Sequence, residues 1–180
     1  MTSDETPADP GPDPADPAVP DPLRRAAELV AGGTDGADAL ERRLKRDALR
    51  SIGRIKPAAV EGVDFESDVL GGDFFAGLPA PLQGIAIART EGVLAFYHRV
   101  GWAPGFLGAP LEGTVPDEGL EPLRARYHAT DLHDLAYVHP KHFEKMLGKP
   151  GAASLWETLK RRATELRAAG PGPTGPPAAP

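Results

Sequence analysis

The chain has 180 residues, enough for one domain with a hydrophobic core, and its 26 acidic and 20 basic side chains give a net charge of −6. It contains no cysteine, which excludes disulfide bonds, thiolate metal ligands and thiol nucleophiles. No segment approaches the roughly 18 apolar residues of a membrane span, and the N-terminus lacks the basic start and apolar run of a signal peptide. We therefore expect a cytoplasmic protein that does not enter a membrane.

The two ends of the chain differ from its middle in composition. Residues 1–22 contain six acidic residues and no basic one, with many prolines, whereas residues 170–180 are proline, glycine, alanine and one threonine. Such segments have too few large apolar groups to offset the conformational entropy lost on ordering. The sequence thus predicts disordered tails at 1–21 and 170–180 around a single globular domain at 22–169.

Two helices are predicted in the first third of the chain. Asp21 followed by Pro22 is typical of the N-cap and first residue of a helix, and the glycines at 32 and 33 end it. A second helix is expected from about Ala37 to Ile55, because apolar residues recur there at helical spacing. Its apolar stripe consists of Leu40, Leu44, Ala48, Ile52 and Ile55.

The middle of the domain has the pattern of a β-hairpin. The apolar runs "GIAIAR" and "VLAFYHRV" flank Thr90-Glu91-Gly92, and a three-residue loop with a glycine is a common hairpin connection. We predict this hairpin at about 84–100, at the centre of a small sheet because both of its faces are apolar. The sequence "LHDLAYV" predicts a third strand at about 132–138.

The remaining elements are predicted as helices. Segments with a capping residue, an apolar periodicity or a closing glycine occur at about 67–75, 117–127, 140–147 and 154–166. Within the last one, Ser154 to Glu157 forms a capping box. The predicted fold class is therefore α+β, a small sheet packed by four to five helices.

A cluster of histidines lies late in the chain. The segment 127–143, "YHATDLHDLAYVHPKHF", holds four of the five histidines together with two aspartates. A zinc or iron site needs three or four side chains that converge on one ion, but the predicted strand would place Asp131 and His133 on one face and Asp134 on the other. We therefore expect no metal and no other cofactor. The weak metal candidates are His128, Asp131, His133 and His142.

Two loops are unusually apolar for connecting segments. "FFAGLPAPLQG" at 74–84 and "FLGAPLEG" at 106–113 combine stiff, turn-rich backbone with large side chains of the kind that anchor partners. The candidate binding residues are Phe74, Phe75, Trp102, Phe106, Leu107 and Leu111. They favour a non-catalytic interaction or regulatory module over an enzyme, with an unknown protein or a second copy of the chain as partner.

Two other functions stay open. The first is a small metal-dependent hydrolase built on the His/Asp cluster at 128–142. The second is nucleic-acid binding through the basic helix at 38–56, where Arg and Lys lie all around the predicted helix and alternate with Glu41 and Asp47. Because this mixture is typical of a solvated helix surface, we do not expect nucleic acid as the partner.

Overall fold

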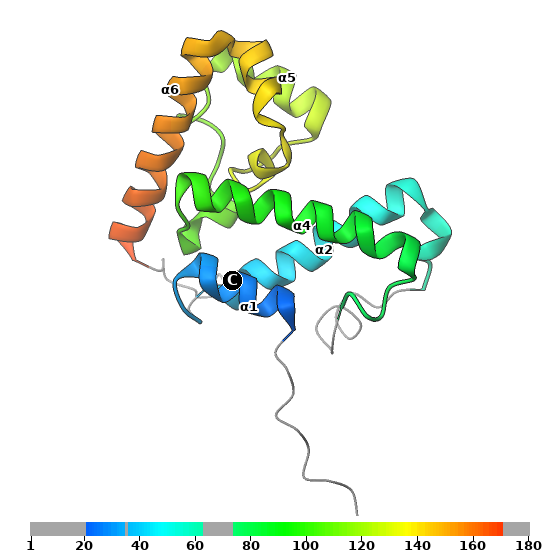
Figure 1. Ribbon diagram of the computed structural model, residues 1–180. Coiled ribbons are helices and arrows are strands. Elements are labelled where there is room, and N and C mark those ends of the chain that lie inside the picture. Colours follow the sequence, from blue (N-terminus) through cyan, green and yellow to red (C-terminus); the bar gives the residue numbers. More distant parts are fainter. Residues whose placement is uncertain (1–20, 35, 63–73, 171–180) are drawn as a thin grey trace, which may run out of the picture.

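A computed structural model describes residues 21–34, 36–62 and 74–170 (Figure 1). The helices of this part are α1 (Pro22–Ala31), α2 (Ala37–Ile55), α4 (Ala80–Val100), α5 (Asp117–Tyr127) and α6 (Pro140–Ala169). Short 3₁₀ helices lie between them, namely η1 (Pro57–Ala59), η2 (Pro104–Gly108) and η3 (Asp134–Tyr137). The tails predicted at 1–21 and 170–180, apart from Asp21 and Gly170, and most of the helix expected at 67–75 lie outside the described residues.

The first two helices form as the sequence predicts. The Asp21 carboxylate accepts a hydrogen bond from the Leu23 backbone N–H at 2.9 Å, and Gly32 ends α1 with a positive φ of 71°. α2 runs over Ala37–Ile55, and the apolar stripe read from the sequence faces inward except at Ile55, which is 60% exposed. Local signals at the helix ends are sufficient here because they act within one turn.

The predicted hairpin at 84–100 is wrong, because all of these residues belong to the single helix α4. α4 lies against α1, α2, η3 and α6, so it is apolar on several sides, and such a helix resembles a strand with two buried faces in sequence. Its buried residues nevertheless follow helical spacing. They are Leu82, Ala86, Thr90, Val93, Phe96, Tyr97 and Val100.

The third strand predicted at 132–138 is also wrong, since Asp134–Tyr137 form η3. Side chains of this segment bind backbone N–H groups that a strand would use for pairing. The Asp134 N–H donates to the Asp131 carboxylate at 3.0 Å, and the Asp134 carboxylate accepts from the Thr130 N–H at 2.8 Å. Such local bonds favour a turn over a strand. The described residues contain no sheet, only one antiparallel bridge between Pro110 and Asp131, so the fold is helical and not α+β.

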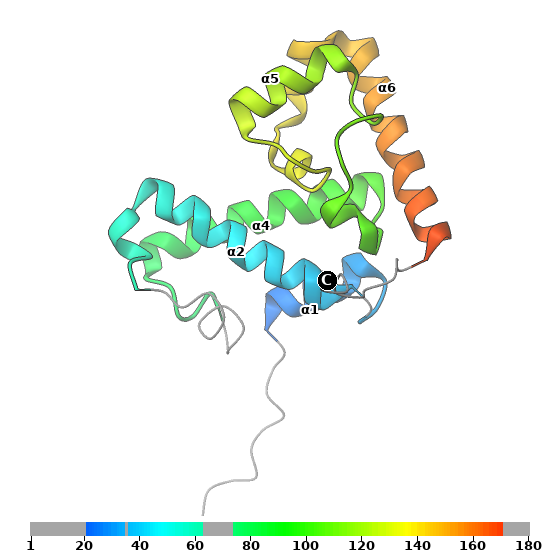
Figure 2. The same cartoon turned by 180° about the vertical axis from the view of Figure 1, so that it is seen from behind.

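The C-terminal helices complete the fold. α5 occupies the predicted residues 117–127, whereas α6 continues from Pro140 to Ala169 with one break at Gly148, whose φ is 69°. Because the helix resumes at once after this break, with Pro150 in its first turn, the capping box at 154–157 does not begin it. α5 and α6 lie on one side of α4, and α1 and α2 on the other (Figure 2). None of the described helices is long and apolar enough to cross a membrane.

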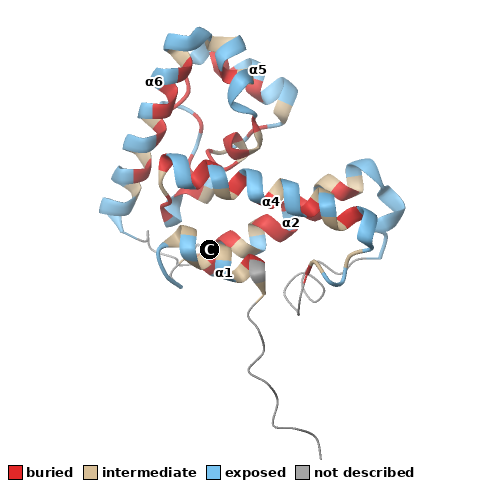
Figure 3. Cartoon of the chain, viewed as in Figure 1, coloured by how far each residue is buried: buried red, intermediate tan, exposed pale blue. Residues whose placement is uncertain are grey.

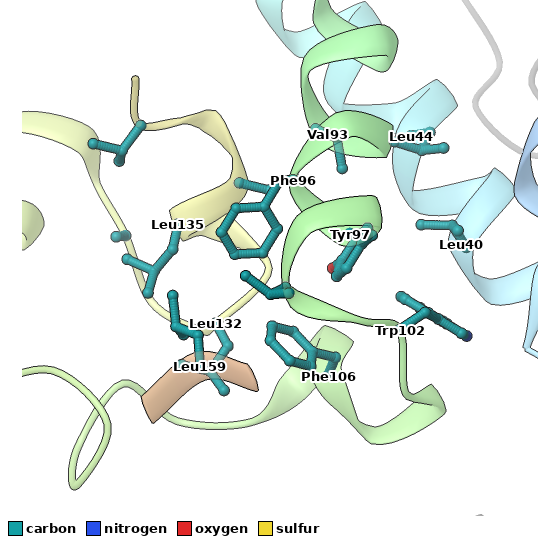
Figure 4. Close-up of a cluster of buried hydrophobic side chains, with 14 of the residues drawn as sticks. Leu40, Leu44, Val93, Phe96, Tyr97, Trp102, Phe106, Leu132, Leu135 and Leu159 are labelled. Carbon is teal, nitrogen blue, oxygen red and sulfur yellow. The ribbon is translucent and has the colours of Figure 1, made fainter. Parts of the chain in front are cut away.

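The core is centred on α4. Buried residues face the contact between α2 and α4 and the space enclosed by α4, α5 and α6 (Figure 3). Leu40 and Leu44 of α2 lie on one side of α4, and Leu132 and Leu135 lie on the other (Figure 4). The Tyr97 ring of α4 stacks on the His133 ring and makes edge contacts with Trp102 and Phe106 in the loop that follows α4. It thus connects α4 to both of these segments.

The helical conformation of α4 can be tested at Gly92. Gly92→Ala should raise the free energy of unfolding by about 0.5–1 kcal/mol, because alanine favours a helix and nothing lies within 4 Å of the added methyl group. Urea denaturation measures the change. Gly53→Ala is the control. Its methyl group would lie 2.9 Å from Val60 Cγ2, so this variant should not show the increase in the free energy of unfolding. Destabilisation by Gly92→Ala would indicate a positive φ, as in a hairpin loop.

Candidate functional site

A partly buried arginine, Arg43, joins α2 to the segment between α5 and α6. Arg43 Nε donates to Asp47 Oδ2 at 3.0 Å, one turn further along α2. Its Nη1 donates to Asp131 Oδ2 at 3.2 Å and its Nη2 to Asp134 Oδ1 at 2.9 Å. Burial alone would lower the pKa of Arg43, but the three carboxylates raise it, so the guanidinium stays charged. One side chain thus holds together residues that are about 90 positions apart.

His133 lies next to this arginine and is fully buried. Its Nδ1 is 2.6 Å from the Tyr97 hydroxyl and its Nε2 is 3.1 Å from Asp47 Oδ2. A carboxylate only accepts, so this pattern assigns the proton to Nε2 and makes the Tyr97 hydroxyl the donor to Nδ1. Burial raises the pKa of Tyr97 well above its usual value, which keeps that donor protonated. Both ring nitrogens of His133 are therefore occupied.

Asp47 is the acceptor that the network shares. Its Oδ2 also accepts from the Tyr137 hydroxyl at 2.5 Å. Burial would raise the pKa of Asp47, but the hydrogen bonds from His133 and Tyr137 and the charge of Arg43 outweigh it and lower the pKa to about 2. Burial also raises the pKa of Tyr137, helped by the neighbouring Asp47 charge. At neutral pH Asp47 is ionised and the tyrosine is not.

A pocket of about 230 Å³ opens beside the network, between α2, α4 and residues 127–137. We call it the arginine pocket. Its lining residues are Arg43, Asp47, Arg50, Ser51, Arg54, Arg89, Tyr127, His128, Thr130, Asp134 and Tyr137. The five from α2 follow one another at spacings of four, three, one and three residues, so they lie on one helix face.

Three arginines of this pocket make no ion pair with any residue that the structure describes: Arg50, Arg54 and Arg89. The Arg89 guanidinium lies over the Tyr137 ring at 3.9 Å from its centroid, and its Nε is buried without a hydrogen-bond partner in the described part of the chain. Burial lowers the pKa of Arg89; the nearby Tyr137 and Asp47 act in the opposite direction, and the charge of Arg54 adds to the lowering. The positive charges of these three arginines are therefore not compensated by an ion pair within the described residues.

The predicted metal candidates do not meet at one point. Asp131 faces Arg43, His133 is enclosed by Tyr97 and Asp47, and His142 pairs through Nδ1 with the Tyr127 hydroxyl, while His128 is exposed at the arginine pocket. No group of three or more His, Asp or Glu side chains among the described residues could hold a metal ion.

The predicted apolar binding residues lie mostly in the core. Phe74, Trp102, Phe106 and Leu111 are buried, and Phe75 and Leu107 are partly buried. Trp102 is only 5% exposed and its ring lies 4.8 Å from the Tyr97 ring, centroid to centroid. In this conformation the loop after α4 closes the core and does not present an apolar surface.

The sequence prediction missed the arginine pocket, although α2 contains one signal for it. Arg43, Asp47, Arg50 and Arg54 recur at helical spacing, as the apolar stripe does. The other residues of the pocket come from distant segments. Comparison with known protein families, with curated protein sequences and with solved structures gave no match.

The low pKa of Asp47 makes stability depend on acid pH. Because the pKa in the folded state is about 2 and the ordinary value is 3.8, ionised Asp47 stabilises the fold by about 2 kcal/mol above pH 4, and this is lost as pH falls towards 2. Asp47→Asn should remove that part of the pH dependence in denaturant titrations between pH 6 and 2. Tyr137→Phe should shift the loss to higher pH, and the exposed Glu121→Gln should not move it. An unchanged profile for Asp47→Asn would contradict the network.

The buried position of Trp102 predicts a large effect on stability. Trp102→Ala should lower the free energy of unfolding by about 3–5 kcal/mol, because it leaves a cavity beside Tyr97. Urea denaturation gives the value. A loss below about 1 kcal/mol would instead indicate an exposed side chain that is free to contact a partner.

Proposed function

We propose that the protein is a non-catalytic binding module and that the arginine pocket holds an anionic group of its ligand. The observation that supports this most directly is the set of arginines Arg50, Arg54 and Arg89, which line one pocket without an ion-pair partner in the described chain. Positive charges that are gathered in this way repel one another and do not favour folding, and such departures from stable design are typical of functional sites. A bound anion would remove the repulsion.

The interior groups support a non-catalytic role. General acid–base catalysis needs a group that can take up or release a proton at the site. The nitrogens of His133 are bonded to Tyr97 and Asp47, and the low pKa of Asp47 keeps that carboxylate ionised. The side chains that are most typical of catalysts in this region therefore hold the fold together.

The other functions read from the sequence receive less support. A metal-dependent hydrolase would need Asp131 and His133 to leave Arg43, Tyr97 and Asp47, which are their partners in this conformation. An interaction module based on the apolar loops would need its anchors at the surface. We therefore propose an interaction module whose binding site is the arginine pocket and not the apolar loops. We place it in the cytoplasm, as expected for a chain without cysteine.

Anion binding can be measured by thermal unfolding. Sulfate, phosphate or citrate at ten times its dissociation constant should stabilise the full chain by about 1.4 kcal/mol, or roughly 3–6 °C, relative to chloride at equal ionic strength. Arg54→Gln and Arg89→Gln should lose this shift. Arg42→Gln and Arg46→Gln are matched controls, because they remove the same charge from exposed positions of α2 outside the pocket.

Two results would contradict this proposal. One is that no anion stabilises the chain beyond the effect of chloride. The other is an equal loss of the shift in the pocket variants and in the controls, because that pattern indicates general charge screening and not a site.

A further inference from the structure

The hydrogen-bond donors that face the arginine pocket restrict the chemistry of its ligand. Each hydroxyl group of the lining has one proton, and three of these four hydroxyls donate it within the chain. Ser51 Oγ donates to the Asp47 carbonyl at 2.9 Å, and Thr130 Oγ1 donates to Asp134 Oδ2 at 2.9 Å. The Tyr137 hydroxyl donates to Asp47, and that of Tyr127 pairs with a histidine nitrogen. The hydroxyls of Ser51, Thr130 and Tyr137 are therefore not available as donors to a ligand, and that of Tyr127 is held by its hydrogen bond to His142.

The donors that remain are the three arginines and one histidine ring. Arg50, Arg54 and Arg89 have no ion-pair partner in the described chain, and His128 is exposed at the same pocket. Guanidinium groups donate in a fixed fork that matches pairs of oxygens, and they have no acceptor. The bound group must therefore be rich in acceptor oxygens.

We infer that this group is a phosphate monoester, held by Arg50, Arg54 and Arg89 as a dianion. The inference rests on the function proposed above and deepens it. A carboxylate has two oxygens and one charge, which a single bidentate arginine can satisfy. A phosphate monoester offers three terminal oxygens and a charge of about −1.5 to −2, which corresponds to three arginines.

The charges of the pocket also orient the phosphate. Asp47 and Asp134 line the part of the pocket where Arg43 binds both of them. Their carboxylates repel an anion there, whereas the exposed Arg50 and Arg54, which make no ion pair in the described chain, attract it. We therefore expect the phosphate to bind nearer to these two arginines than to the Arg43 network.

The size of the pocket limits what else of the ligand it can enclose. Its volume of about 230 Å³ is below the roughly 300–1,000 Å³ of pockets that bury a whole drug-sized molecule. The pocket encloses a phosphate group with a few attached atoms, which is the end of a small metabolite or of a phosphorylated side chain. A polynucleotide presents singly charged diesters along an extended backbone and needs a longer basic surface.

Isothermal titration of the full chain at pH 7.5 tests this inference with three probes that share one ring: phenyl phosphate, phenyl sulfate and benzoate. Phenyl phosphate should bind at least tenfold more tightly than the other two. Arg54→Gln and Arg89→Gln should weaken it at least tenfold, and Arg42→Gln and Arg46→Gln by less than twofold. Circular dichroism checks that each variant is folded. If Arg89→Gln does not fold, Arg54→Gln alone provides the test, because Arg54 is exposed.

The outcomes separate this inference from the proposed function. Equal, pocket-dependent binding of all three probes would overturn the phosphate inference and leave the anion-binding function standing. No pocket-dependent binding of any probe would overturn both. Pocket-dependent binding of a single-stranded oligonucleotide without binding of phenyl phosphate would replace the inferred ligand by nucleic acid. Release of inorganic phosphate from phenyl phosphate would support the phosphate site and overturn the non-catalytic role.

Discussion

The partly buried guanidinium of Arg43, with its three carboxylate partners, is the constraint on which this structure depends. A charge removed from water has to be compensated by partners with good geometry, because an unpaired buried charge is very unfavourable. Arg43 meets this requirement through three aspartates, two of which belong to the segment between α5 and α6. The backbone hydrogen bonds within that segment are local to η3, so this network and the burial of its apolar residues fix its position against α2 and α4.

The same network divides the polar residues into two groups. Residues in its interior, such as Asp47, His133 and Tyr137, satisfy one another and leave no free proton donor. Residues at its edge, above all Arg54 and Arg89, are charged and make no ion pair within the described chain. Two of the predicted metal candidates, Asp131 and His133, therefore have their partners within this network, and residues that the sequence analysis took for an ordinary solvated helix surface line the candidate site.

α4 shows how tertiary contacts can reverse a pattern read from sequence. Its residues alternate as in a hairpin over 84–100, yet Ala86, Val93 and Val100 also recur every seven residues, as a buried helix face does. The choice between the two depends on α2 and the aromatic loop after α4, which cover the helix on more than one side. The burial of Trp102 has the same origin, because a loop that crosses the end of the core places its large side chains inside.

The sequence by itself determined the elements whose signals act within one turn. Asp21 and Gly32 bound α1, the apolar stripe defines α2, and Gly148 breaks α6, because caps, positive φ angles and helical periodicity are local properties. Only the tertiary structure decided that residues 84–100 are helical and that Arg50, Arg54 and Arg89 line one pocket. These features join residues 40 to 90 positions apart, and the free energy that selects them comes from burial and charge pairing between segments that no local pattern connects.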